Sequence, residues 1–150
     1  MEAEAPGLQD LIRDVAVMVV VRNLQVSVAF YSQKLGFTLH DQQAHIAALS
    51  CGSLRLYLFT HSPPTPDKPA ITLTNLNGPD TAPMIIDLLV SDCQAAYQRL
   101  LARGVVFLTP PHSPPWGGLR CFAKDPDGYL IELEENEASP FLSRAAESGG

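Results

Sequence analysis

The chain has 150 residues, about the length of one domain, of which 46% are hydrophobic and 17% are charged. It can therefore bury a core and is not disordered throughout. Ten basic against sixteen acidic residues give a net charge of −6, which argues against a nucleic-acid-binding protein and against docking on anionic membranes.

The chain carries no pattern typical of a membrane-spanning or secreted protein. Its longest strongly apolar run, residues 15–21, is far shorter than the ~20 residues of a membrane helix. The first residues lack the basic and apolar regions of a signal peptide. The three cysteines are widely spaced and odd in number, so we expect reduced thiols and a cytoplasmic protein.

The first half predicts a strand, a helix and three further strands. A β-branched run over residues 15–21 indicates the first strand, and Asn23 is the expected N-cap of the helix. Gly36 stands where a glycine commonly ends a helix. The helix face is formed by apolar residues at helical spacing, namely Leu24, Val28, Tyr31 and Leu35. The later strands are expected over residues 37–40, 45–51 and 54–60, with a hairpin turn at Gly52 and Ser53.

The second half repeats this order of elements. An apolar strand is predicted over residues 84–90, Asp92 is the expected N-cap of a helix, and Gly104 ends that helix. Strands follow over residues 105–108, 119–124 and 130–134, and a turn at residues 125–128 joins the last two.

The two halves lie in nearly constant register, which indicates an internal duplication. Asn23 and Asp92 are 69 residues apart, and Gly36 and Gly104 are 68 apart. We predict an α+β fold of two βαβββ modules that form paired curved mixed sheets with the helices outside. The expected limits are a single domain over residues 11–137, modules over about 14–61 and 84–135, a Pro-rich linker over 62–83, and flexible ends over 1–10 and 138–150.

Several motifs together resemble one known family. The helix motif of residues 23–31, followed by Leu-Gly-Phe at 35–37, is similar to the first helix of the vicinal oxygen chelate superfamily, which includes glyoxalase I, bleomycin and fosfomycin resistance proteins and extradiol dioxygenases. The segments 102–105, 114–118 and 125–133 resemble its C-terminal signature. The resemblance covers about residues 14–135. It implies two curved sheets that enclose a cavity, in many members completed by dimerisation.

The metal site of this superfamily can be tested position by position. The resemblance places the four ligand positions on Ala16, Tyr57, Ile85 and Glu132, and only Glu132 is a good ligand for a divalent cation. Asp87 lies two residues beyond Ile85, but its counterpart in the first half is Met18, which is no oxygen donor. We therefore predict no metal and no cofactor. This disfavours the superfamily's metal-dependent chemistry.

What remains resembles the metal-free branch typified by bleomycin resistance proteins, which sequester a cationic drug in an acidic, aromatic-lined crevice, usually at a dimer interface. On that basis and on strand alternation, the candidate ligand-binding residues are Trp116, Glu132, Tyr57, Met18, Asp87, Arg55, Phe59 and Arg120. Two of them have a structural alternative. Trp116 could pack on the sheet edge, and Glu132 could pair with Arg55 or Arg120.

The first functional hypothesis is metal-independent binding of a small organic molecule, with a cationic or heteroaromatic compound as the expected ligand and a homodimer as the expected assembly. The alternative is a lyase, isomerase or dioxygenase with a degenerate or atypical metal site. A third hypothesis is a non-catalytic partner or scaffold. The sequence leaves open whether the two modules pair within one chain or across a dimer, and no catalytic residue can be named from it.

Overall fold

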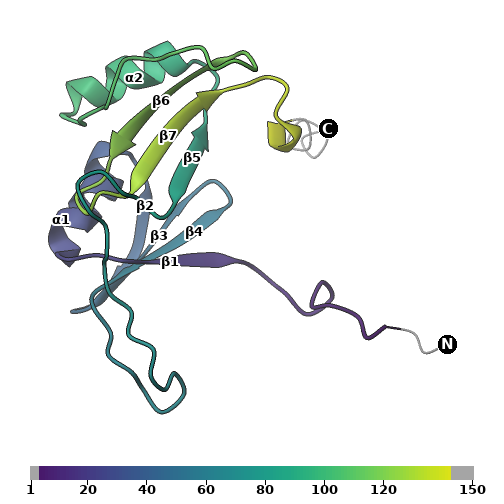
Figure 1. Cartoon of the computed structure of the whole chain (residues 1–150), viewed down its shortest axis with the longest axis vertical. Helices are drawn as coiled ribbons and strands as arrows, with labels where there is room; N and C mark the ends of the chain where they lie inside the picture. The colour runs from purple at the N-terminus through teal and green to yellow at the C-terminus, as the bar shows by residue number, and fades with distance from the viewer. Residues whose placement is uncertain (1–3, 143–150) are drawn as a thin grey trace.

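The computed structural model describes residues 4–142. Figure 1 shows two separate sheets, one formed by each half of the chain. Sheet 1 has the strand order β1-β4-β3-β2, and sheet 2 has the order β5-β7-β6. The strands of sheet 1 are β1 (Ala16–Val20), β2 (Thr38–Gln42), β3 (Ile46–Cys51) and β4 (Leu54–Phe59). Those of sheet 2 are β5 (Ile85–Leu89), β6 (Leu119–Lys124) and β7 (Leu130–Glu135).

The helix of the first module begins and ends as its sequence predicts. The Asn23 side chain accepts a hydrogen bond from the Val26 N–H at 3.1 Å and caps α1 (Leu24–Ala29). The helix then widens into a π-helical segment, η1 (Phe30–Lys34), in which the Leu35 N–H reaches the Phe30 carbonyl. Gly36 follows at φ +86°, a backbone conformation that only glycine adopts freely, so the chain turns into β2 there.

The second module repeats the start but lacks one strand. Asp92 caps α2 (Cys93–Ala102) by accepting from the Ala95 N–H at 2.9 Å. The strand predicted over residues 105–108 is wrong, because this segment makes only an isolated bridge between Phe107 and Ala123. Val106 is 74% exposed and Pro110 follows closely, so little holds the segment against β6. The α+β class with two βαβββ-like modules is nevertheless confirmed.

The two modules share one strand register. In sheet 1, β1 pairs in parallel with β4, and Met18 lies opposite Tyr57. In sheet 2, β5 pairs in parallel with β7, and Asp87 lies opposite Glu132. Alternate residues point toward the helices and are buried, among them Val19, Leu56, Leu58, Ile86, Ile131 and Leu133. Neither α1 nor α2 covers the opposite face of its sheet.

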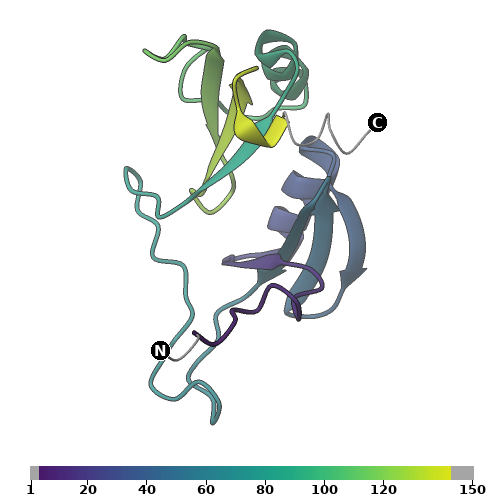
Figure 2. The same ribbon diagram turned by 90° about the vertical axis from the view of Figure 1, so that its right-hand side faces the viewer.

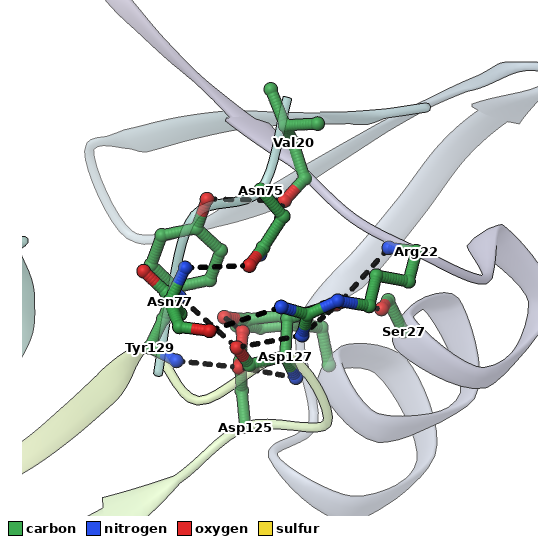
Figure 3. Close-up of polar contacts among 9 residues, drawn as sticks. Val20, Arg22, Ser27, Asn75, Asn77, Asp125, Asp127 and Tyr129 are labelled. Carbon is green, nitrogen blue, oxygen red and sulfur yellow. Dashed lines mark hydrogen bonds and ion pairs between the residues drawn. The ribbon is translucent and has the colours of Figure 1, made fainter. Parts of the chain in front are cut away.

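A buried polar cluster joins the modules, as Figure 3 shows. Asp127, in the turn between β6 and β7, is 4% exposed and accepts from the Arg22 N–H at 2.8 Å and the Ser27 hydroxyl at 3.1 Å. Beside it, the Tyr31 hydroxyl donates to Asp125 at 2.6 Å. We call these five residues the intermodule clamp. Burial raises the pKa of Asp125, and the Tyr31 hydrogen bond partly offsets this.

The long connection between the modules is irregular but attached to both. Asn75 donates to the Val20 carbonyl at 3.1 Å, and Asn77 donates to the Asp127 carbonyl at 3.0 Å. Figure 2 shows this connection running beside both sheets. Of the predicted flexible ends, residues 1–3 and 143–150 lie outside the described residues. Within residues 4–142, no helix has the length and hydropathy that crossing a membrane requires.

Candidate functional site

The predicted site residues divide between the two helix-free faces. Met18, Arg55, Tyr57 and Phe59 lie on sheet 1, on what we call the open face of sheet 1. Asp87, Arg120 and Glu132 lie on the open face of sheet 2, with Trp116 in the loop before β6. Strand alternation therefore groups the residues of each module, while the two groups stay on separate sheets within one chain.

The open face of sheet 2 is acidic. Carboxylate oxygens of Asp87, Glu132 and Glu134 all lie within 4.8 Å of one another. Loss of water contact, a hydrogen bond with Glu134 and the charges of Glu132 and Glu134 raise the pKa of Asp87 to about 8. Burial and the charge of Glu134 also raise the pKa of Glu132, which Arg120 partly offsets. Such a face holds a proton near neutral pH and releases it when a cation approaches.

Arg120 connects this acidic face to the only tryptophan. Its Nη1 lies 3.8 Å from Glu132 Oε1, and its guanidinium carbon lies 4.8 Å from the centre of the Trp116 ring. Of the two partners considered for Glu132, Arg120 is therefore the one found. Trp116 remains 65% exposed, so its ring does not serve mainly as packing. Gly118, at φ +74°, holds the loop close to the Glu135 carbonyl, where a Cβ would not fit.

The open face of sheet 1 carries two shallow pockets. One of about 460 Å³ contains Arg55 and Tyr57, and one of about 410 Å³ contains Met18, Phe59 and His45. Arg55 Nε lies 3.2 Å from Asp14 Oδ2, and its Nη1 donates to the Gly52 carbonyl at 3.0 Å. The other partner considered for Glu132, Arg55, is thus engaged elsewhere.

Sequence reasoning missed three residues on these faces. Glu134, two residues after Glu132 on β7, is not among the candidate ligand-binding residues, yet its carboxylate belongs to the acidic cluster. His40 and Ser50 were not considered together, yet His40 Nε2 lies 2.7 Å from Ser50 Oγ. The pairing of β2 with β3 skips His40, since Leu39 pairs with Leu49 and Asp41 with Ala48. Such a bulge redirects a side chain, and single-sequence patterns give no signal for it.

A third cavity, of about 570 Å³, lies between the modules. It runs along the unpaired edge of β5 and is bounded on the other side by the β3–β4 turn, with Leu35 and Phe37 from the end of the first helical segment. Its walls are mostly apolar, and Asp87 and Ile85 belong to them. Neither the Trp116 loop nor Tyr57 contributes to this cavity.

The residues at the implied metal positions do not fit a site shared by both modules. Sheet 1 offers Ala16, which has no donor atom, and the phenol of Tyr57. Sheet 2 offers Glu132 together with Asp87 and Glu134, whereas Ile85 has no donor atom. Three carboxylates are oxygen donors suited to a hard cation, but they all come from one sheet. These residues therefore do not form a metal site shared by the two modules.

Comparison with known families agrees with this architecture. A model of the Glyoxalase/Bleomycin resistance protein/Dioxygenase superfamily matches residues 15–133. The match spans most of the chain, and the protein belongs to this superfamily.

Individual relatives share 30% or less of their sequence with this chain. Bleomycin resistance proteins from Geobacillus stearothermophilus and Staphylococcus aureus are 30% identical over 119 residues, which cover 75% of this chain and 89% of each relative. A glyoxalase-related enzyme from Fulvimarina pelagi superimposes with a TM-score of 0.69 at 25% identity, covering 86% of this chain and 92% of the other. Lactoylglutathione lyase from Agrobacterium tumefaciens gives a TM-score of 0.69 at 17% identity over 87% and 99% of the two chains, a likeness of fold alone.

Proposed function

We propose that the protein binds a small organic molecule with a cationic or heteroaromatic group, holding it without chemical conversion and without a metal. The observation that carries this is the open face of sheet 2, where an exposed Trp116 ring lies next to Arg120, which reaches Glu132. A flat heteroaromatic ring stacks on the exposed indole, and a cationic group is attracted by the carboxylates of Asp87, Glu132 and Glu134. The similarity to bleomycin resistance proteins supports this choice of ligand class.

The acidic cluster gives the proposed binding a defined pH dependence. A ligand cation near Asp87 favours its ionised form and so displaces the proton that Asp87 holds. Affinity should therefore rise with pH up to about 8, where Asp87 ionises without help. A ligand that binds only through stacking on Trp116 would show no such rise.

We further propose a homodimer in the cytoplasm. β1 and β5 are edge strands of their sheets, and the open faces carry large exposed apolar side chains, Met18 at 54% and Ile85 at 47% among them. A second copy that covers these faces would bring residues of sheet 1 and sheet 2 into one chamber, with Met18, Tyr57 and Phe59 as its apolar wall. The free thiols of Cys93 and Cys121, 3.9 Å apart, favour a reducing compartment. Sedimentation equilibrium tests the assembly, and a monomer at all concentrations contradicts it.

Trp116 is the only tryptophan, so its fluorescence reports on this site alone. We expect a panel of cationic glycopeptides, flavin-like compounds and heteroaromatic amines to contain a ligand that changes this fluorescence saturably. Glu132→Gln should weaken that ligand about tenfold, as expected for loss of a charged hydrogen-bond partner. Glu137→Gln, on the surface beyond β7, is the matched control. If no compound alters the fluorescence or the melting temperature, the proposal fails.

Metal analysis of the purified protein separates the metal-independent proposal from its alternative, a lyase, isomerase or dioxygenase with an atypical metal site. The cluster of Asp87, Glu132 and Glu134 supports this alternative, because three carboxylates can bind a metal ion. Stoichiometric nickel, zinc, iron or manganese that is lost in the Glu132→Gln variant would overturn metal independence.

A further inference from the structure

A row of polar side chains crosses three strands of sheet 1. His40 from β2, Ser50 from β3 and Arg55 from β4 all line the pocket of about 460 Å³. Ser50 lies between the other two, because it is 2.7 Å from His40 Nε2 and directly opposite Arg55 in the strand register. Ala48 and Tyr57, the next register pair on this face, continue the pocket, and the small Ala48 side chain leaves space above the sheet.

This pocket has unused hydrogen-bond donors. The Tyr57 hydroxyl has no hydrogen-bond partner among residues 4–142, and its side chain is partly exposed at 37%. Arg55 uses Nε and Nη1 for Asp14 and Gly52, which leaves Nη2 for a ligand. When His40 Nε2 carries the proton, His40 donates to Ser50 and the Ser50 hydroxyl is free to donate into the pocket.

The charge of the pocket selects the kind of ligand. None of the pocket-lining residues in the described part of the chain is acidic, and Arg55 brings a permanent positive charge. Asp14, from the segment before β1, already places a carboxylate on one edge of Arg55. Both groups are exposed, so this pair is weak and an incoming anion can replace Asp14.

We infer that this pocket binds the acidic group of a small organic ligand, a carboxylate or a phosphate, through Arg55, Ser50 and Tyr57. The guanidinium supplies a charge-assisted hydrogen bond, and the two hydroxyls bind the remaining oxygens. This inference goes beyond the proposed function, which places a cationic or aromatic group on the open face of sheet 2, and does not depend on it. It implies a ligand with an acidic group at sheet 1 and, if both faces serve one molecule, a cationic or aromatic part at sheet 2.

The test uses sodium benzoate and inorganic phosphate as separate probes, with sodium chloride at equal ionic strength as the reference. Backbone amide NMR shifts are followed in the full chain. We expect saturable shifts at Ser50, Arg55 and Tyr57, with a dissociation constant of roughly millimolar order for such small probes. The probe that saturates shows whether the group recognised is a carboxylate or a phosphate.

Four variants make the test specific. Arg55→Gln should weaken the anion at least about tenfold, and Ser50→Ala and Tyr57→Phe about threefold each, as expected for a charged and for single neutral donors. Asp14→Asn should tighten binding about twofold, because it removes the competing carboxylate of an exposed pair. Thr81→Ala, at an exposed position outside the pocket, is the matched control and should change nothing.

Equal affinity in the wild type and in Arg55→Gln overturns the inference, as do shifts that do not saturate or that map to sheet 2. The outcome is distinguishable from that of the Trp116 experiment, because simple anions carry no cationic or stacking group. If simple anions bind here and no compound changes the Trp116 fluorescence, the proposed cationic site is wrong and this pocket is supported. If a compound changes the Trp116 fluorescence and no anion binds here, the cationic site is supported and this inference is wrong.

Discussion

The two modules have the same strand register but opposite chemistry on their open faces. Where sheet 1 carries Met18 and Tyr57, sheet 2 carries Asp87 and Glu132 at the equivalent positions. The buried alternate positions, by contrast, are apolar in both sheets. Burial therefore constrains one face of each strand, while the other face is free to take the character that a ligand requires. The side chains of the open faces, and not the fold, therefore determine the class of ligand.

The largest effect on stability is expected from a substitution that breaks the hydrogen bonds between the two modules. Asp127→Ala removes the acceptor of the Arg22 N–H and the Ser27 hydroxyl in a nearly buried site. Orphaned buried donors should cost about 3 kcal/mol in the free energy of unfolding. Urea denaturation measures this, with the exposed Asp10→Ala as control. A loss no larger than that of the control would mean that the clamp does not hold the modules together.

Two tyrosine hydroxyls donate hydrogen bonds between the modules, and removing each one measures how much that bond contributes to the free energy of unfolding. Tyr31→Phe removes a donor to the Asp125 carboxylate and should cost about 2 kcal/mol, since hydrogen bonds to charged groups are strong. Tyr129→Phe removes a donor to the neutral Val20 carbonyl and should cost about 1 kcal/mol. The same denaturation experiment compares them. The reverse order would show that the ionised state of Asp125 adds nothing to its hydrogen bond.

The acidic face predicts a pH dependence that sheet 1 should not share. The folded state keeps the Asp87 proton up to about pH 8, whereas an unfolded aspartate loses it near pH 4. Between these values the folded state binds more protons, so stability falls as pH rises. Asp87→Asn abolishes this fall and should be more stable than wild type at pH 8.5 by at most about 1 kcal/mol, because the site is exposed. The equivalent change in sheet 1, Met18→Leu, should leave the pH profile of unfolding unaltered, and a profile unchanged by Asp87→Asn would contradict the assignment.

The smallest expected effect concerns the contact between Arg120 and Trp116. Arg120→Gln removes the cation from the indole face. It should lower the free energy of unfolding by about 0.5 kcal/mol, which is typical of an exposed cation–π pair. The fluorescence of Trp116 should change at the same time, since its ring loses its charged neighbour. Arg99→Gln, on the exposed side of α2, is the control. Identical emission spectra for both variants would show that Arg120 does not rest on the indole in solution.

Regular, local features were predictable from the sequence. The caps at Asn23 and Asp92 require only a side chain that reaches a nearby N–H, and the strands follow from alternation and β-branched runs. Alternation also placed Arg55 on the same face as Tyr57, and Asp87 on the same face as Ile85, because the strand period fixes which residues of one strand share a face.

Features that depend on irregular backbone or on distant partners were not predictable. The segment 105–108 has strand-like residues, but Phe107 packs on Tyr97 of α2 with ring centres 4.8 Å apart and only one bridge to β6 forms. The pair of His40 and Ser50 depends on a bulge, and the pairing of Arg55 with Asp14 depends on the path of an irregular segment. Tertiary geometry decides such contacts, and no local period records them.

The intermodule clamp is one-sided. The acids that receive Arg22, Ser27 and Tyr31 lie in the β6–β7 turn of the second module, whereas the equivalent turn of the first, at Gly52 and Ser53, borders the cavity and carries no acid. The two halves are therefore not interchangeable, and a tandem of two first halves would lack the acceptor that unites them. Because the clamp residues lie outside both open faces, either open face can be changed without altering the hydrogen bonds that join the modules.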